Sequence, residues 1–257
     1  DADASTVDRR HRGTIEVEPR RRRRHGQLGG RAGVRSPSDA ALAGEDRRSP
    51  AAAVTLSGEP IGHLAPRARR ARGLHFVPEE RLGRGAVPQM SLAHNTLLTR
   101  SETLGRGGWI ASRALRRLAQ HLIERFDVRA GGADAAAASL SGGNLQKFIV
   151  GREIDARPKL LVVSQPTWGV DVGAAALIRR ELLALRDAGC ALLVVSEELD
   201  ELFEIADRLV VIAKGRLSPA LAVAAASVER IGQWMSGLWG EPGPPGVPTP
   251  VDGARHA

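Results

Sequence analysis

The chain has 257 residues, of which 42% are hydrophobic and 3% aromatic, and its formal net charge is +8. This length is sufficient for one large α/β domain or two small ones with a core that needs no cross-links. A single cysteine, Cys190, excludes an intramolecular disulfide framework and a cysteine-based zinc site, and no apolar run approaches the roughly 20 residues that span a bilayer.

The positive charge is concentrated in the first quarter of the chain. Residues 1–72 hold 16 Lys and Arg against 9 Asp and Glu, whereas residues 73–257 hold 21 against 20. A nucleic-acid enzyme more often carries its basic stripe on the folded body. We therefore expect no nucleic-acid partner.

Both ends of the chain are of low complexity. Residues 1–53 have no sustained periodicity, few large apolar residues and the arginine run Arg20–Arg24. This pattern predicts a basic segment that is disordered or altered in reading frame. The support for a shifted frame is that Arg20–Arg24 can be back-translated so that the next frame reads Ala-Gly-Val-Asp-Gly. This is a hypothesis, because codon degeneracy makes such back-translation permissive. The Gly- and Pro-rich residues 240–257 predict a disordered tail.

Residues 54–239 show the patterns of strands and helices and are expected to form the domain. Strands are predicted on either side of a Ser57-Gly58 turn and at 74–77, 159–163 and 190–196, and a strand, a turn and a second strand at 208–217. Helices are predicted at 66–73, over most of 90–138, and at 141–153, 172–188, 197–206 and 227–238.

The order of these elements indicates an α/β fold. The strands and helices between residues 159 and 213 alternate, which implies a parallel sheet with right-handed crossovers. The runs 159–163 and 190–196 are continuously apolar, as in strands that are buried on both faces. This is the core of a nucleotide-binding α/β fold.

The stretch LSGGNLQK at residues 140–147 has the chemistry of a phosphate contact. Two glycines at the start of a helix let the backbone approach a phosphate, and free N–H groups with the positive end of the helix dipole favour an anion. The hydroxyl of Ser141 can donate to a phosphate oxygen. The alternative is that Ser141 only caps the helix beside a glycine turn.

Five stretches, in this order, resemble the second ATP-binding half of ABC importer ATPases that serve simple sugars and nucleosides. They are FVPEERLGRG (76–85), SLSGGNLQK (139–147), PTWGVDVGA (166–174), LLVVSEELDEL (192–202) and RLVVIAKGRL (208–217). In that class the ATPase subunit is two fused nucleotide-binding halves. The resemblance implies a P-loop NTPase-type ABC nucleotide-binding domain with a parallel sheet core and a helical signature subdomain at about residues 90–150, incomplete at its N-terminus.

The resemblance also implies how the signature acts. In this family it closes across a dimer on the γ-phosphate of ATP held by the opposite half, so ATP and Mg²⁺ are expected in trans, at a site completed by the partner. The signature residues are Leu140, Ser141, Gly142, Gly143, Asn144 and Gln146. Gly169 and Asp171 match the dimer-facing D-loop, although Asp171 can also be read as a turn residue.

The positions that would serve this half's own ATP depart from the family pattern. Ser164 and Gln165 stand where the family places an Asp that orders Mg²⁺ and a Glu that polarises water. A hydroxyl has no charge to hold a hard cation, and an amide cannot accept a proton. Glu197 replaces the switch histidine, and Glu79 occupies the glutamine-loop position.

The phosphate loop is missing as well, since no G-x-x-x-x-G-K-[ST] motif occurs anywhere in the sequence. We therefore expect no catalytic residue, no metal site and no hydrolysis by the chain alone. The resemblance implies a peripheral protein at the cytoplasmic face of the cell membrane. Its expected partners are a complete nucleotide-binding half, membrane permease subunits and, indirectly, an extracellular solute-binding protein.

Two alternatives stay open from the sequence. The chain can be a non-functional, truncated remnant of such a subunit, because the central phosphate loop is missing. It can also be a nucleic-acid-associated ABC-type ATPase, since repair and translation ATPases use LSGG-type signatures and the first quarter of the chain is basic.

Overall fold

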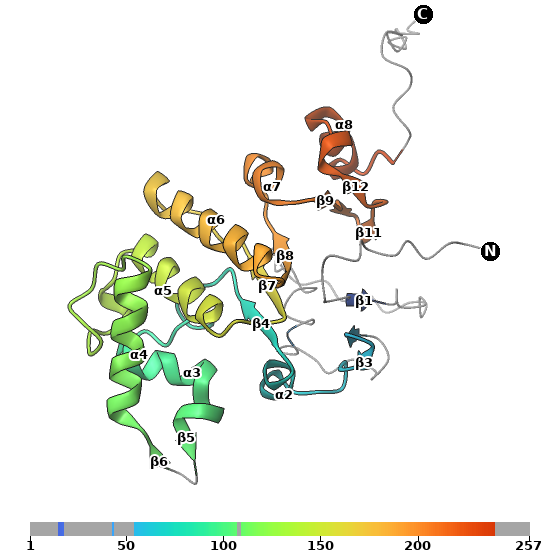
Figure 1. Ribbon diagram of the computed structural model, residues 1–257. Coiled ribbons are helices and arrows are strands. Elements are labelled where there is room, and N and C mark those ends of the chain that lie inside the picture. Colours follow the sequence, from blue (N-terminus) through green and yellow to red (C-terminus); the bar gives the residue numbers. More distant parts are fainter. Residues whose placement is uncertain (1–14, 18–42, 44–53, 107–108, 240–257) are drawn as a thin grey trace, which may run out of the picture. The chain divides into compact units, whose positions relative to one another are not determined.

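The computed structural model describes residues 15–17, 43, 54–106 and 109–239 (Figure 1). The predictions for the remainder of 1–53 and for the tail 240–257 lie outside these residues. The chain packs as two compact units whose boundary falls between Glu198 and Leu199. Within the described ranges no helix has both the length and the apolar character needed to cross a membrane.

A three-stranded parallel sheet forms the centre of the first unit. Its order is β4 (Leu74–Val77), β7 (Leu160–Ser164), β8 (Ala191–Val195). All residues of β7 are buried, as its apolar run predicts. The same prediction for β8 is wrong, because β8 is only half-buried along its length. No described strand pairs with the outer side of β8.

The strand expected at 208–213 does not join this sheet, whose third strand is β4, paired with β7. In the second unit β9 (Arg208–Leu209) pairs antiparallel with β12 (Leu221–Ala222), and β10 (Ile212–Ala213) pairs antiparallel with β11 (Arg216–Leu217). The Lys214-Gly215 turn has φ of +50° and +72°, which favours a tight hairpin. An apolar run does not reveal which kind of sheet its strand will join.

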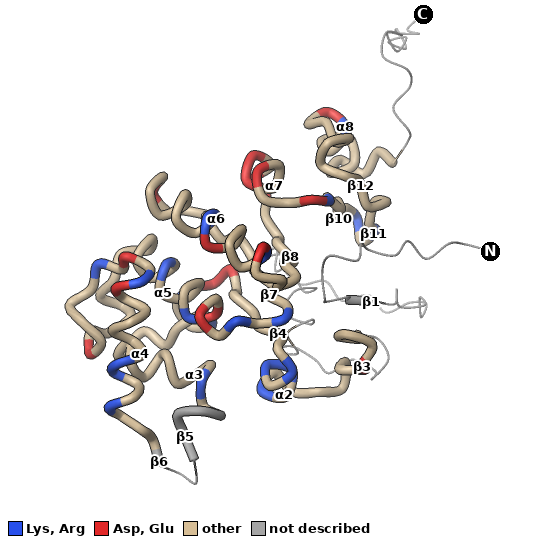
Figure 2. Tube along the Cα trace, in the orientation of Figure 1, with Lys and Arg blue, Asp and Glu red and all other residues tan. Residues whose placement is uncertain are grey.

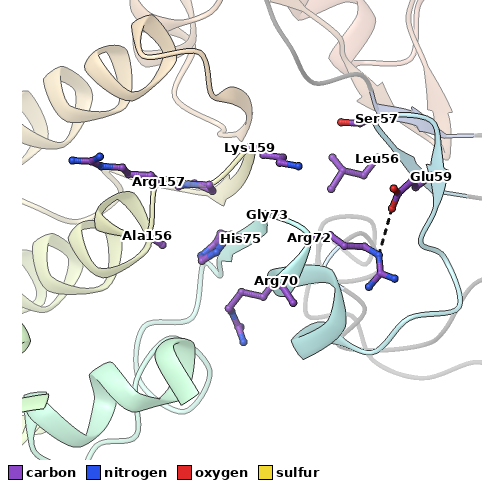
Figure 3. Close-up of a pocket in the computed structure, with 12 residues that line it drawn as sticks. Leu56, Ser57, Glu59, Arg70, Arg72, Gly73, His75, Ala156, Arg157 and Lys159 are labelled. Carbon is purple, nitrogen blue, oxygen red and sulfur yellow. Dashed lines mark ion pairs between the residues drawn. The ribbon is translucent and has the colours of Figure 1, made fainter. Parts of the chain in front are cut away.

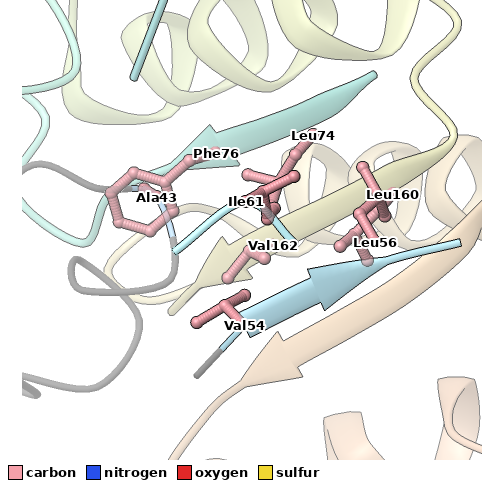
Figure 4. Close-up of a cluster of buried hydrophobic side chains, with 8 residues drawn as sticks. All are labelled: Ala43, Val54, Leu56, Ile61, Leu74, Phe76, Leu160 and Val162. Atoms are coloured by element: carbon pink, nitrogen blue, oxygen red, sulfur yellow. The ribbon is translucent and has the colours of Figure 1, made fainter. Parts of the chain in front are cut away.

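A small antiparallel sheet, in the order β1 (Ile15–Val17), β2 (Val54–Leu56), β3 (Glu59–Pro60), lies beside the parallel one. The predicted Ser57-Gly58 turn joins β2 to β3, which is confirmed. Alternate side chains of β4 and β7 face one way and pack against this region (Figure 4). The shared core consists of Ala43, Val54, Leu56, Ile61, Leu74, Phe76, Leu160 and Val162.

Two helices pack on the parallel strands and on each other. They are α5 (Gly142–Asp155), which contacts β4, and α6 (Val172–Asp187), which contacts β8 (Figure 1). Both were predicted to within two residues. After α6 the chain turns at Gly189 with φ of +95°, a conformation that glycine adopts without strain.

The region expected to be mostly helical over 90–138 is only partly so. It contains α3 (Leu92–Leu104) and α4 (Ser112–Arg125), which pack together with α5. The hairpin of β5 (Gly105–Arg106) and β6 (Trp109–Ile110) interrupts them. Beyond α4 the chain runs as a loop with a single 3₁₀ turn, Ala137–Ser139.

The basic turn predicted at 66–73 is α2 (Pro66–Ala71), which ends before Gly73. Figure 2 shows Lys and Arg gathered on α2, whereas both charge signs occur on α5 and α6. The second unit holds α7 (Leu199–Ile205) and α8 (Val228–Met235). Its own core consists of Leu209, Val211, Ile231 and Trp234.

Candidate nucleotide-binding site

Ser141 caps α5 and still has a hydrogen to donate. Its Oγ accepts hydrogen bonds from the backbone N–H of Asn144 (3.4 Å) and from its side-chain amide (2.8 Å). These two bonds use the acceptor capacity of the hydroxyl, and its O–H remains available on an exposed side chain. The capping role and the phosphate-binding role are therefore compatible.

The first turn of α5 favours an anion. It begins with Gly142 and Gly143 and contains no acidic residue. The first N–H groups of a helix have no partner within the helix, and they point to its positive end. Asn144 is oriented by Arg129, whose backbone N–H donates to Asn144 Oδ1 at 2.8 Å. That bond leaves the amide nitrogen of Asn144 facing Ser141.

The loop between β7 and α6 lies against these glycines. A Cβ on Gly143 would lie 3.2 Å from Asp171 Oδ2, and a Cβ on Gly142 would lie 3.9 Å from the carbonyl oxygen of Gly169. The loop is therefore close to both glycines, and most closely to Gly143. The structure brings the predicted signature and D-loop residues together on one face.

Asp171 is fixed by the helix that follows it. Its Oδ1 accepts a hydrogen bond from the backbone N–H of Ala174 at 2.9 Å, which makes Asp171 the N-cap of α6. This bond lowers the pKa of the Asp171 carboxyl, which therefore stays ionised at neutral pH. This geometry is compatible with both interpretations of Asp171, as a turn residue and as a D-loop residue.

Two side chains, Gln146 and Arg81, donate hydrogen bonds to backbone carbonyl groups of this loop. Gln146 is buried, and its Nε2 donates to the carbonyl oxygen of Pro166 at 3.0 Å. Arg81 donates from Nε to Gln146 Oε1 at 3.1 Å and from Nη2 to the carbonyl oxygen of Trp168. Sequence reasoning missed Arg81, and its place in the stretch 76–85 was the one signal that could have found it.

The outer surface of this face is partly apolar. The loop side chain Trp168 is 59% exposed, and Val172 at the start of α6 is 83% exposed. Leu140, which precedes the signature serine, is half-buried. The signature face therefore combines hydrogen-bond donors with exposed apolar side chains.

The four departures from the family pattern gather at the carboxyl edge of the sheet. Ser164 ends β7 and aligns with Val195, and Glu79 and Glu197 follow the ends of β4 and β8. Ser164 is 1% exposed, and within the described part of the chain its Oγ has no hydrogen-bond partner. Gln165 Oε1 accepts the backbone N–H of Glu197 at 3.3 Å, so this amide is engaged with the loop.

The end of β7 does not fit a Mg²⁺ ion. Hard divalent cations take anionic or carbonyl oxygens, and the two residues at the end of β7 offer a neutral hydroxyl and an amide that is already bonded. Among the described residues no group of three or more His, Cys, Asp or Glu is placed to hold a metal.

The C-terminal half of α5 is anchored by a buried ion cluster. Glu153, fully buried, accepts hydrogen bonds from His75 Nδ1 and Arg152 Nε, both at 2.8 Å. Arg152 donates further to the carbonyl oxygens of Asn95 and Gly85, both at 3.0 Å. Burial alone would raise the pKa of Glu153, but Arg152 and His75 hold it at about 2. The cluster fixes α5 to β4 and α3.

A cavity of about 480 Å³ lies at the opposite, amino edge of the sheet, next to Lys159. Arg70, Arg72 and Arg157 add positive charge to its lining. Figure 3 shows these three side chains extending in different directions, and Arg72 pairs with Glu59 at 3.6 Å. The charged ends do not converge on one point, so the cavity offers no single binding point for an anion.

No protein-family model matches the chain. Known proteins do match it by sequence. It is 38% identical over 221 residues to the glucose import ATP-binding protein TsgD13 of Haloferax volcanii, a match that covers 83% of this chain and 40% of that protein. It is also 38% identical over 186 residues to the nucleoside import ATP-binding protein NupA of Lactococcus lactis, covering 72% of this chain and 37% of that protein. The chain thus spans about two fifths of the length of these curated relatives.

Solved structures share the fold at low sequence identity. A dimeric, post-hydrolysis ATP-binding cassette bound to ADP and Pi aligns with a TM-score of 0.56 and 18% identity, covering 66% of this chain and 72% of that one. An ATP-binding subunit of an ABC transporter aligns with a TM-score of 0.56 and 17% identity, covering 80% and 78%. The expected fold class is confirmed: the chain has the fold of an ABC ATPase domain, and by sequence it is homologous to the ATP-binding proteins of sugar and nucleoside importers.

Proposed function

We propose that this chain is a nucleotide-binding component of an ABC transporter that imports sugars or nucleosides, and that it supplies its signature to ATP held by a partner half. The single observation that carries this proposal is the contrast between two places. Ser141, the glycines after it and Asp171 share one face, whereas Ser164 and Gln165 leave the end of β7 without an acidic pair.

The proposed role of each residue follows from the hydrogen-bond donors or the charge that it offers. ATP bound in trans, with its Mg²⁺, supplies the phosphate that is transferred to water. The Ser141 hydroxyl donates to an oxygen of its γ-phosphate, and the free N–H groups at the start of α5 favour the negative charge. Asp171, ionised and fixed by Ala174, faces the partner. Gln165 can orient a water molecule but cannot take its proton.

The proposal extends to the assembly. The domain comprises residues 54–239 with a helical subdomain at about 90–150, between a basic segment and a tail. Its partners are a complete nucleotide-binding half and membrane permease subunits, with a solute-binding protein acting indirectly, and its place is the cytoplasmic face of the membrane. Relatives named for glucose and nucleoside import support this class of transporter.

Phosphate release tests the proposal. Three samples are compared in the presence of ATP and Mg²⁺: the full chain, the remaining half of the Haloferax volcanii relative expressed on its own, and their mixture. We expect no release by the chain, and faster release by the mixture than by the other half alone. Robust release by the chain itself, lost on Ser164→Ala or Gln165→Ala, would overturn the proposal.

A further inference from the structure

We infer that Arg81 is a positioning residue that holds the signature and the loop between β7 and α6 in one fixed arrangement. Its contacts join the loop after β4 to both segments. Its consequence for a partner's nucleotide rests on the proposed function. The contacts themselves lie within this chain and can be tested without a partner.

The guanidinium of Arg81 touches three parts of the site. Nε donates to Gln146 in α5, and Nη2 donates to the carbonyl oxygen of Trp168 in the loop. Nη1 lies beside the signature, because a Cβ on Gly142 would be 2.8 Å from it. A side chain at position 142 would therefore occupy the space that Arg81 uses.

The backbone from which Arg81 reaches is itself fixed. Its carbonyl oxygen accepts the N–H of Ala86 at 2.7 Å, and the carbonyl oxygen of Glu80 accepts the N–H of Gly85 at 3.0 Å. This tight turn packs on α5, since a Cβ on Gly85 would lie 2.9 Å from Ile149. We infer that the position of Arg81 is set by α5 and β4, and that its side chain in turn fixes the loop between β7 and α6.

The chemistry of the contact requires arginine. A planar guanidinium presents several donors at fixed angles and can bond two acceptors that face it from different directions. The two acceptors here are an amide oxygen in α5 and a backbone carbonyl oxygen in the loop. A lysine ammonium is a single point of charge on a flexible stem, so it is expected to hold one acceptor and leave the other without its donor.

The loop is held at two carbonyl groups by side chains that also bind each other. Gln146 holds Pro166, Arg81 holds Trp168, and Arg81 donates to Gln146. Arg81 is half-exposed, unlike the buried Glu153 cluster. Its removal should therefore free the loop while the core of the unit stays folded.

Fluorine NMR of the full chain with fluorotryptophan tests the local arrangement. The chain has four tryptophans, and Trp168→Phe assigns the resonance of Trp168. We expect Arg81→Gln to shift and broaden that resonance and Arg81→Lys to do so less. The matched control is Arg117→Gln on an exposed position of α4, which should change nothing. Trp234, in the core of the second unit, should keep its resonance in every variant.

The second readout is ATP-dependent association with the other half of the Haloferax volcanii relative. We expect Arg81→Gln to weaken it about tenfold, which corresponds to about 1.4 kcal/mol, with the melting temperature nearly unchanged. An unmoved Trp168 resonance in both Arg81 variants overturns the inference. A shifted Trp168 resonance in Arg81→Gln together with ATP-dependent association as strong as that of the wild type also overturns it. Absence of ATP-dependent association by the wild-type chain instead overturns the proposed function, and Trp168 then decides the local role of Arg81 alone.

Discussion

The signature face and the carboxyl edge of the sheet are joined by the loop from Gln165 to Asp171, yet they are chemically different. At the signature face, Ser141 is exposed and bonded, with a hydrogen left to donate. At the edge, Ser164 is buried and its Oγ is bonded to nothing described. The two hydroxyls thus differ in accessibility, because the one at the signature face is exposed and the one at the edge is buried.

This difference between the two regions indicates that the groups for phosphate contact and the groups for metal binding can be replaced independently. Phosphate contact across an interface needs a hydroxyl and backbone N–H groups at a helix start, and these depend on glycines and a cap. Metal binding and proton transfer need charged oxygens at the end of β7. Since the two sets share no side chain, one can be replaced while the other keeps its geometry.

The largest effect expected is that of Ser164→Asp. This position is buried, and burial disfavours a charged carboxylate, so the substitution should destabilise the chain by about 4 kcal/mol at neutral pH. Millimolar Mg²⁺ should not restore the stability, because the next residue, Gln165, is a neutral amide that is already bonded to the backbone N–H of Glu197. Chemical denaturation with and without Mg²⁺ measures this.

Ser164→Ala is the matched control. It removes a buried hydroxyl that has no partner, so the variant should be as stable as the wild type or more stable by about 1 kcal/mol. A loss of stability on this substitution, or rescue of Ser164→Asp by Mg²⁺, would mean that the edge retains polar partners for a ligand. The contrast between the two regions would then fail.

A smaller effect is expected from Glu153→Gln, which tests the support of the signature helix. The substitution leaves the Arg152 guanidinium buried without its carboxylate, which should cost about 3 kcal/mol. The control is Asp134→Asn, since the Arg116–Asp134 pair is exposed and its loss should cost under about 1 kcal/mol. Equal losses for the two variants would contradict the role of the cluster.

The pH dependence of stability gives the same cluster a second test. The pKa of Glu153 is about 2 in the folded chain and has an ordinary value of 4.5. A lowered folded pKa stabilises above the unfolded value, and this contribution is lost as the pH falls from 4.5 to about 2. The difference in unfolding free energy between wild type and Glu153→Gln should shrink over this window. A difference in unfolding free energy that stays constant over this window would mean that the ionisation of Glu153 does not stabilise the folded chain.

The elements with strong patterns could be predicted from the sequence. The continuous apolar run of β7 and the apolar spacing of α6 gave bounds within two residues. The strand pattern at 208–213 was assigned to the wrong sheet because hairpin pairing around Lys214-Gly215 is decided by the turn. The hairpin at 105–110 was missed because two-residue strands have no measurable period.

The candidate site could be predicted only in part. The resemblance supplied Ser141 and Asp171, and the structure shows that their segments meet. The Arg81–Gln146 hydrogen bond joins residues 65 positions apart and leaves no local pattern. The inactivity of the carboxyl edge stays a prediction, now with a physical basis in the buried, unbonded Ser164.

The most direct test of the central claim is the affinity of the full chain for the other half of the Haloferax volcanii relative, measured with and without ATP. We predict that ATP strengthens association for the wild type and for Gln165→Ala. Ser141→Arg, which fills the signature face, should lose the strengthening. Loss with Gln165→Ala and retention with Ser141→Arg would contradict the account, because ATP would then be bound at the carboxyl edge of this chain.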